Sequence, residues 1–156
     1  MRLRDDVRII RYENLDVSVG TIEQRGLLHT VLKVPGHHEV HSVCVHLGLR
    51  ESHRRKQLQL LGKLLDSIPA NAPVIVAGDF NDWRKQADSI LYDHGMIEAF
   101  RHEYGSSAKS FPARWPLLSL DRIYVRNATT HNPEVLHRRP WSHLSDHVPL
   151  AVEIRL

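Results

Sequence analysis

The run Val74-Ile75-Val76-Ala77 constrains the fold of this 156-residue chain more than any other segment. Four consecutive apolar residues, three of them β-branched, predict a short strand that is covered on both faces of its sheet. The segment Gly78-Asp79-Phe80-Asn81-Asp82 follows at once, and its glycine allows a sharp exit that leaves Asp79 and Asn81 reaching outward together. Ligand sites favour the carboxyl ends of such strands, although these residue types also form ordinary turns.

Strand and helix patterns are interspersed along the rest of the chain. A helix is predicted over 52–68, where aliphatic residues recur at helical spacing, with Ser52 as a candidate N-cap and Pro69 as the stop. Shorter helices are predicted over 84–93 and 96–104. Further strands are predicted over 7–11, 15–19, 26–34, 40–47, 119–125 and 148–154. Because strands outnumber helices, the sequence predicts one sheet-rich α/β (α+β) domain over residues 1–156.

Composition is that of a soluble globular domain, with 42% hydrophobic and 25% charged residues. No segment approaches the roughly 18 apolar residues of a membrane span, and residues 1–6 lack the apolar core of a secretory signal, so we expect a cytoplasmic protein. The single cysteine, Cys44, lies between two valines and is interpreted as a small buried side chain. The net charge of +3 comes from scattered basic residues, without the dense basic tract and aromatic platform of a nucleic-acid-binding module.

Two clusters of basic residues have alternative interpretations. His37, His38 and His41 lie close enough to suggest a metal site. No Cys pair or helical His pair accompanies them, however, and Pro35-Gly36 favours a hairpin turn there. The segment 54–56, Arg-Arg-Lys in the first turns of the predicted helix, is interpreted as a solvated face that a nearby phosphate site would put to a second use.

Asp121 needs a partner, because strand alternation places it on the same face as Ile123 and Val125. An unpaired carboxylate there would cost several kcal/mol. His147 precedes the last predicted strand at a similar place, and a carboxylate beneath a histidine orients and charges the imidazole. The sequence therefore predicts an Asp121–His147 dyad. His46 lies on the face of its strand that carries small residues, where a half-buried core histidine is the simplest interpretation.

Two common kinds of site are excluded. Ser145-Asp146-His147 cannot converge as a serine-hydrolase triad because the three residues are adjacent, and no Gly-x-Ser-x-Gly elbow is present. The Asp79-x-Asn81 segment is not an EF-hand, since neither the required glycine nor the bidentate glutamate follows it.

Four ordered motifs resemble the C-terminal half of the endonuclease/exonuclease/phosphatase superfamily, which includes deoxyribonuclease-I-like nucleases, neutral sphingomyelinases and inositol-phosphate phosphatases. The pattern is closest to sphingomyelinase-like and uncharacterised bacterial members. The resemblance implies part of a four-layer α/β sandwich with mostly antiparallel sheets. The motifs are His46-Leu47-Gly48-Leu49 with Arg54 and Gln57, Gly78-Asp79-Phe80-Asn81, Leu120-Asp121-Arg122-Ile123 and Ser145-Asp146-His147.

The resemblance implies a hydrolase that attacks phosphate esters with an activated water. Asp79 would orient or deprotonate that water, and Asn81 would hold it or stabilise the phosphorane. A divalent cation, Mg²⁺ or Mn²⁺, would act as Lewis acid, and hard oxygen ligands suit these ions. The resemblance also places Asp146, with Asp79, at or near the metal.

The resemblance assigns the two histidines to the phosphate. His147, supported by Asp121, would donate to a non-bridging phosphate oxygen. His46 would contact the phosphate or assist the leaving group. DNA, phospholipid head groups and inositol phosphates are all possible substrates, and a degenerate member that only binds phosphorylated ligands or a protein partner is the alternative.

The expected N-terminal portion of this fold is not found in the sequence. Family members carry an Asn on the first core strand and a principal metal-binding Glu, whereas Asn14 and Glu23-Gln24 lie in hairpin-like segments. We therefore expect weak metal binding and poor turnover. A partial sandwich would also expose one sheet face, which gives a physical motive for a homodimer.

Overall fold

The computed structural model describes residues 6–21, 23–37 and 39–156. Residues 1–5 and His38 lie outside this described part. The prediction that residues 1–6 are not a secretory signal and the prediction for the cluster of His37, His38 and His41 partly depend on them. The elements, in chain order, are β1 (Arg8–Asp16), β2 (Gly26–Lys33), β3 (Glu39–His46), α1 (Glu51–Ser67), β4 (Val74–Asp79), α2 (Gln86–Asp93), β5 (Ile97–Glu98), α3 (Ala99–Tyr104), β6 (Asp121–Arg126), β7 (Thr129–Val135), η1 (Trp141–His143) and β8 (Leu150–Arg155).

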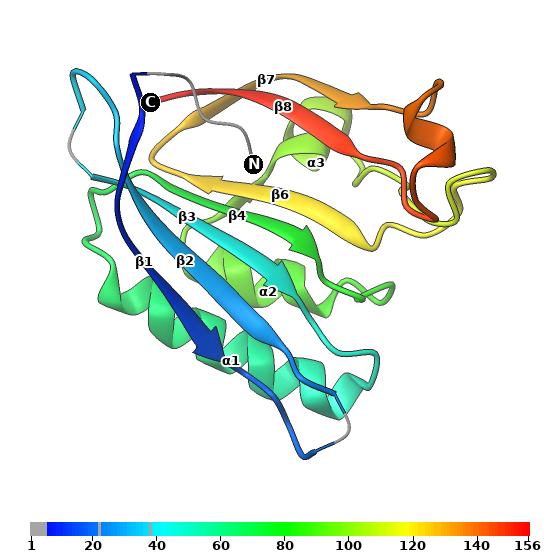
Figure 1. Cartoon of the computed structure of the whole chain (residues 1–156), viewed down its shortest axis with the longest axis horizontal. Coiled ribbons are helices and arrows are strands. Elements are labelled where there is room, and N and C mark those ends of the chain that lie inside the picture. Colours follow the sequence, from blue (N-terminus) through cyan, green and yellow to red (C-terminus); the bar gives the residue numbers. More distant parts are fainter. Residues whose placement is uncertain (1–5, 22, 38) are drawn as a thin grey trace.

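The described strands form two sheets (Figure 1). The larger has the order β1-β2-β3-β4-β6-β5, and its neighbours are antiparallel except for the parallel pair β3 and β4. The smaller is the antiparallel pair β7 and β8. This arrangement confirms the predicted α/β class with mostly antiparallel sheets. Among the described helices, none is long and apolar enough to cross a membrane.

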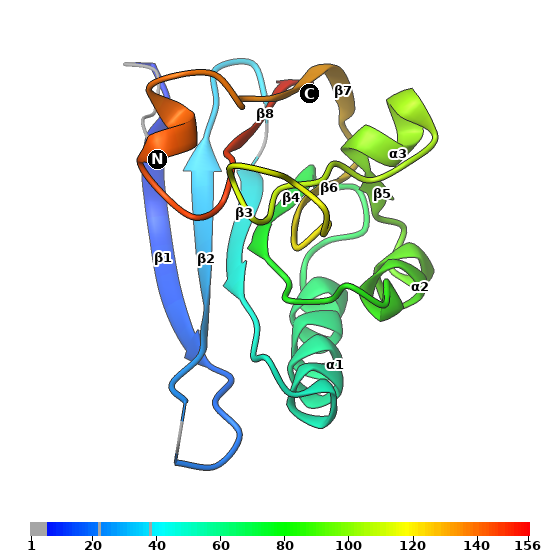
Figure 2. The same ribbon diagram turned by 90° about the vertical axis from the view of Figure 1, so that its right-hand side faces the viewer.

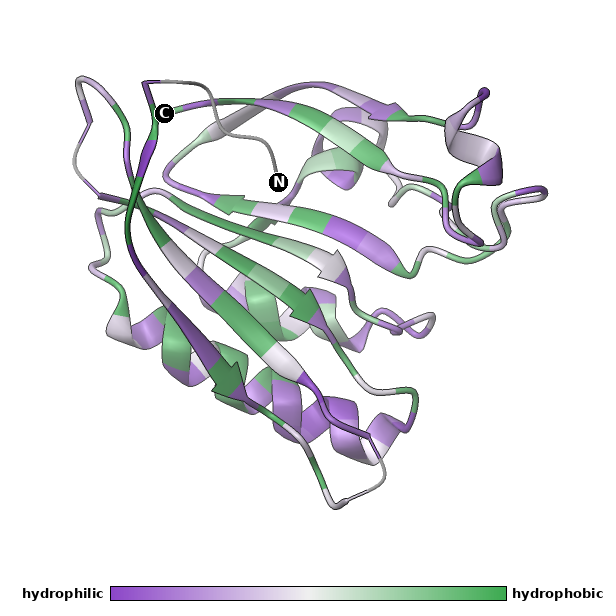
Figure 3. Cartoon of the chain, in the orientation of Figure 1, coloured by the Kyte–Doolittle hydropathy of each residue, from purple (hydrophilic) through white to green (hydrophobic). Residues whose placement is uncertain are grey.

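Helices α1 and α2 cover one face of the larger sheet (Figure 2). The predicted apolar stripe of α1 is buried there, because its leucines pack against the valines of β3 and β4. Figure 3 shows the corresponding pattern, with hydrophobic strands in the middle of the sheet and a helix α1 that alternates between hydrophobic and hydrophilic bands. Residues of this core include Val43, Val45, Leu58, Leu61, Leu65, Val74, Val76, Phe80, Leu91 and Tyr124.

The β7–β8 pair packs on the opposite face, together with α3. It meets the larger sheet at β6, where Ile123 contacts a cluster with Phe100 and Val152. The same face of β1 to β3 is more open, and Cys44 on β3 is exposed there. The prediction of a buried Cys44 was therefore wrong, because alternation turns it away from the α1 side and the second sheet packs against β6 instead.

Several local predictions need correction. The two short strands expected at 7–11 and 15–19 are one strand, β1, because Glu13 and Asn14 pair with β2 instead of forming a turn. Helix α1 starts before Ser52, and its N-cap is Arg50 without a side-chain cap. Strand β7 was missed, since its sequence Thr-Thr-His-Asn-Pro-Glu-Val has no apolar alternation and contains a register shift. The helix expected over 96–104 is the short strand β5 followed by α3.

Candidate active site

Three adjacent strands bring the predicted site residues into one row. Strands β3 and β4 are parallel, so their carboxyl ends meet, and His46 is the register partner of Asp79. Strand β6 runs antiparallel to β4, so its first residue, Asp121, is the partner of Asp79 on the other side. The row lies at the edge of an open cleft of about 630 Å³. The cleft is lined by Arg25, His46, Leu49, Asp79, Asn81, Trp83, Phe111, Leu118, Leu120, Asp121, Asp146 and His147.

Asp79 lies at the centre of this row. Its Oδ2 is 3.6 Å from His46 Nε2, and its Oδ1 accepts a 2.8 Å hydrogen bond from the Asn81 backbone N–H. Burial raises the pKa of Asp79, and the charge of Asp121 adds to this, against the opposing effects of the Asn81 bond and the two histidines. The His46 side chain is 59% exposed, so it is not the half-buried core histidine that was the alternative interpretation. A carboxyl with a raised pKa beside exposed imidazole edges is suited to proton transfer.

His147 and Asp121 are in direct contact. Nδ1 of His147 is 2.7 Å from Asp121 Oδ2, and both side chains are about one-quarter exposed. Partial burial acts to lower the pKa of His147, but the hydrogen bond to Asp121 and the negative charges of Asp121, Asp79 and Asp146 raise it overall. These contacts stabilise the protonated imidazole relative to that of a free histidine, with Nδ1 held by Asp121 and Nε2 facing away from it.

Gly78 permits the close approach of β4 to β3. Its φ is +142°, and a Cβ at this position would lie 2.0 Å from the Val45 carbonyl oxygen. After this exit Asn81 turns inward, with φ +49° and 5% exposure, and its Nδ2 donates to the Leu47 carbonyl at 2.9 Å. Asn81 thus joins the loops that follow β3 and β4, and its Oδ1 and second Nδ2–H are left for other partners.

Asp82, the last residue of the same motif, lies outside the cleft. It is fully buried and accepts a 2.7 Å hydrogen bond from the Ala87 backbone N–H at the start of α2. Its other partner is Arg122, also fully buried, which reaches both the Asp82 carboxylate at 3.5 Å and the Asp88 carboxylate at 3.1 Å. This ion pair anchors the 79–86 loop in the protein interior, while Asp79 and Asn81 face the cleft.

Helix α1 anchors the loop after β3. Gln57 Oε1 accepts from the Gly48 backbone N–H at 2.8 Å, and Arg54 Nη1 donates to the carbonyls of Gly48 and Leu49 at 3.2 and 2.5 Å. Arg54 is 2% exposed and lies 4.9 Å from the Trp83 ring centroid. The prediction of a solvated Arg54 was wrong, because the orphan loop carbonyls bind its guanidinium.

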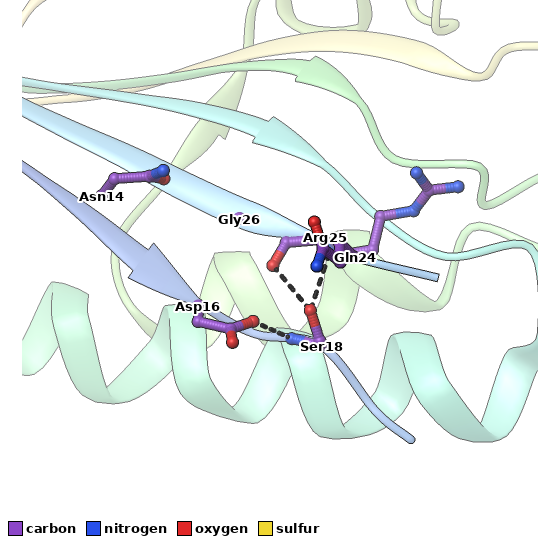
Figure 4. A pocket seen from close by; sticks show the side chains of 6 residues that line it. All are labelled: Asn14, Asp16, Ser18, Gln24, Arg25 and Gly26. Atoms are coloured by element: carbon purple, nitrogen blue, oxygen red, sulfur yellow. Dashed lines mark hydrogen bonds between the residues drawn. The ribbon is translucent and has the colours of Figure 1, made fainter. Parts of the chain in front are cut away.

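Sequence reasoning missed Arg25, which lines the cleft. Figure 4 shows how it is placed: Ser18 Oγ accepts from the Arg25 backbone N–H at 2.9 Å, and the Ser18 N–H donates to Asp16 at 2.8 Å. The guanidinium points away from these bonds and pairs with Glu23 at 3.5 Å. The one feature of the sequence that could have indicated Arg25 as a site residue is its position just before β2, at the end of the sheet that also carries His46. Trp83, also missed, directly follows the Gly78–Asp82 motif.

The residues present do not fit a complete metal site. Within the described residues, no three His, Cys, Asp or Glu side chains are arranged to hold a metal ion. Asp121 is engaged by His147, and one oxygen of Asp79 by a backbone N–H. Asp146 is exposed at the cleft and bonds Ser145. His37 and His41 line a different cavity, at the turn between β2 and β3, with His41 bound to His29 at 2.9 Å.

Sequence comparisons find relatives over most of this chain. A family model described as the endonuclease/exonuclease/phosphatase family matches residues 3–147. The uncharacterized protein YbhP of Escherichia coli K12 is 49% identical over 150 residues, which are 95% of this chain and 59% of YbhP. The chain thus spans less than two-thirds of that relative's length. A UPF0294 protein of Yersinia pseudotuberculosis is 36% identical over 122 residues, covering 74% of this chain and 41% of that protein.

Solved structures agree in fold. A humanized TDP2 of D. rerio has a TM-score of 0.77 at 19% identity, over 97% of this chain and 68% of that one. An endonuclease/exonuclease/phosphatase protein of Bacteroides vulgatus has a TM-score of 0.77 at 22% identity, over 98% and 67%. These likenesses confirm the architecture, and the family model covers nearly the whole chain. This chain therefore belongs to the endonuclease/exonuclease/phosphatase family.

Proposed function

We propose that this chain contributes the site of a hydrolase that cleaves phosphate ester bonds with an activated water. The observation that carries the proposal is the row of His46, Asp79 and Asp121 across three strands, with His147 bound to Asp121 in the same cleft. Such a row provides a base and hydrogen-bond donors side by side in one cleft.

In the proposed reaction a water oxygen attacks phosphorus, and the bond from phosphorus to the ester oxygen breaks. The carboxylate of Asp79 accepts the water proton, which its raised pKa favours. Protonated His147 donates from Nε2 to a non-bridging phosphate oxygen and stabilises the charge that accumulates there. His46, exposed beside Asp79, donates a proton to the leaving oxygen. The amide Oδ1 of Asn81 holds the water.

A Mg²⁺ or Mn²⁺ ion remains part of the proposal, with Asp79 and Asp146 as its donors. Such an ion supplies Lewis-acid chemistry at a phosphate oxygen. Because the described donors do not form a complete site, no step above depends on the ion. We expect weak binding of either ion and poor turnover by the chain alone.

The substrate class is open among DNA, phospholipid head groups and inositol phosphates. One structural neighbour, D. rerio TDP2, is described in complex with a single-strand DNA product, at 17% identity to this chain. That relation makes DNA a reasonable first substrate to test. We also propose a cytoplasmic location and a single, partial domain over residues 1–156. A homodimer through the open face of β1 to β3 is proposed as well, and light scattering after size exclusion tests it.

The alternative proposal is a binding protein without catalytic activity. The incomplete set of metal donors among the described residues favours it. Under that alternative the cleft would hold a phosphorylated ligand through Arg25 and protonated His147, and Asp79 would be dispensable.

Replacing Asp79 with Asn separates the two proposals. An enzyme should lose at least about 100-fold in hydrolysis, because the general base is gone. The assay uses a panel of phosphodiesters and phosphomonoesters, with and without each ion. Asp93→Asn is the matched control, since Asp93 is exposed at the end of α2. Hydrolysis that survives Asp79→Asn unchanged would refute the assignment of the base, and failure on the whole panel would favour the binding protein.

A further inference from the structure

The loops around the cleft carry exposed apolar side chains. Leu49, Trp83 and Leu118 line the cleft and are 56%, 48% and 39% exposed. Trp115 and Leu117, on the same loop as Leu118, are 74% and 58% exposed. Scattered exposed apolar residues need no explanation, but several large ones around one cleft mark an interaction surface.

A second segment adds to this surface. Trp141 and Leu144, 44% and 68% exposed, lie in the segment between β7 and His147. This segment is tied to the 110–118 loop beside the cleft, because the Ala113 N–H donates to the Asp146 carbonyl at 2.7 Å. Figures 1 and 2 show both segments on the same side of the molecule as the loops that follow β3 and β4. We call residues 47–50, 80–85, 111–118 and 136–146 the loop surface.

The exposed charges of the loop surface are mostly positive, and the cleft beside it also contains the partly exposed carboxylates of Asp79 and Asp121. Within these four segments the one exposed acidic residue is Asp146, whereas Asp82 is buried against Arg122. Only Arg84 among the exposed cations has an ion pair within the described part of the chain, with Glu51 at 2.9 Å. The exposed cations are Arg50, Arg84, Lys85, Arg114, Arg138 and Arg139.

We propose that the loop surface binds the surface of a bilayer that contains anionic phospholipids. Tryptophan prefers the boundary between headgroups and acyl chains, leucine gains by entering the hydrocarbon, and arginine and lysine are attracted to anionic headgroups. Single-stranded nucleic acid would also use the tryptophans and cations, but Leu49, Leu117 and Leu144 offer its bases no ring to stack on. The combination of exposed leucines with cations therefore favours lipid.

Membrane binding goes beyond the proposed hydrolysis and does not depend on it. The cleft is lined in part by the loop surface, through Leu49, Trp83 and Leu118 among others, so a docked chain would bring the cleft close to the phosphates of the bilayer. A chain without catalytic activity would bind in the same way. The Asp79→Asn variant is therefore expected to bind vesicles as the unsubstituted chain does, and its hydrolysis is measured separately.

The test is co-sedimentation of the chain with vesicles made of equal parts phosphatidylcholine and phosphatidylglycerol, compared with vesicles of phosphatidylcholine alone. We expect binding to the mixed vesicles that weakens as salt is raised. The double variant Trp115→Ala with Leu117→Ala should bind at least about ten-fold more weakly, because its apolar anchors are lost. Arg138→Gln with Arg139→Gln should weaken binding about five-fold for each arginine removed.

A matched control tests whether the open sheet face binds lipid instead. Tyr12 on β1 is 74% exposed, as Trp115 is, and Leu28 on β2 is 42% exposed. Tyr12→Ala with Leu28→Ala should leave vesicle binding unchanged, and circular dichroism checks that all three double variants are folded. The proposal is overturned if the Trp115 and Leu117 variant binds like the unsubstituted chain, if the Tyr12 and Leu28 variant loses binding equally, or if the chain binds a single-stranded oligonucleotide but no vesicles.

Discussion

Replacing Asp121 with Asn should lower two pKa values at once. The Asp121 carboxylate holds the pKa of His147 above its ordinary value through a 2.7 Å hydrogen bond and its charge. The same charge also contributes to the raised pKa of Asp79, its register partner on β4. An amide at this position keeps the shape but removes the charge, so the pKa values of both His147 and Asp79 should fall.

The expected cost in stability follows from the same contacts. A hydrogen bond to a charged group contributes about 1.5 to 3 kcal/mol, and this one belongs at the lower end because both side chains are about one-quarter exposed. The substitution also relieves repulsion between Asp121 and Asp79, which is about 0.2 to 1 kcal/mol for like charges on adjacent strands. We therefore expect Asp121→Asn to lower the free energy of unfolding by about 1 kcal/mol when His147 is protonated.

The sign of the pH dependence is set by His147. Its pKa is higher in the folded state than in the unfolded chain, so the stabilisation is fully present below the unfolded value of about 6.5 and is lost as pH rises through the higher folded value. Urea unfolding should show Asp121→Asn to be about 1 kcal/mol less stable than the unsubstituted chain below this window. Above the window the difference should be smaller or reversed, because only the relief of repulsion with Asp79 is left. A pKa of His147 that is unchanged in the variant, measured by NMR titration, would refute the reasoning, as would an equal difference in stability at both pH values.

Three further substitutions or probes test the fold around the site. Gly78→Ala should lower the free energy of unfolding by more than about 3 kcal/mol or prevent folding, because its Cβ would overlap the Val45 carbonyl, as measured by urea unfolding and soluble yield. Arg122→Met should cost about 3 to 5 kcal/mol, since it leaves the buried Asp82 carboxylate unpaired, and a thermal melt measures this. Cys44 should react with a thiol reagent in the native monomer at a rate near that of the unfolded chain, because it is exposed on β3, and the assay uses a protein concentration at which light scattering shows a monomer.

Each of these experiments has a control within the chain. Gly36 also has a positive φ but open space around it, so Gly36→Ala should cost much less than Gly78→Ala. Arg139→Met removes an exposed arginine and should leave stability nearly unchanged. Equal losses in either pair would contradict the steric or electrostatic argument, and a Cys44 that reacts only after unfolding would contradict its exposure.

The sequence by itself determined the local patterns on which this fold depends. The stripe of α1 and the apolar run of β4 were predicted because periodicity reports which face of an element is buried. The ordered motifs also identified the family. Alternation failed at β1, because its residues are exposed on both faces of the strand. It failed at β7 because the buried positions there are Thr130 and Pro133 instead of large aliphatic residues.

Only the tertiary structure decided which residues meet. The parallel pairing of β3 with β4 and the antiparallel pairing of β4 with β6 place His46, Asp79 and Asp121 in one row, although they are distant in sequence. The sequence predicts Arg54 as a surface charge, whereas in the fold its guanidinium is buried and donates to the loop carbonyls of Gly48 and Leu49. Whether a side chain is buried, and which groups it contacts, depends on segments that are distant in the sequence. No local pattern of residue types encodes those contacts.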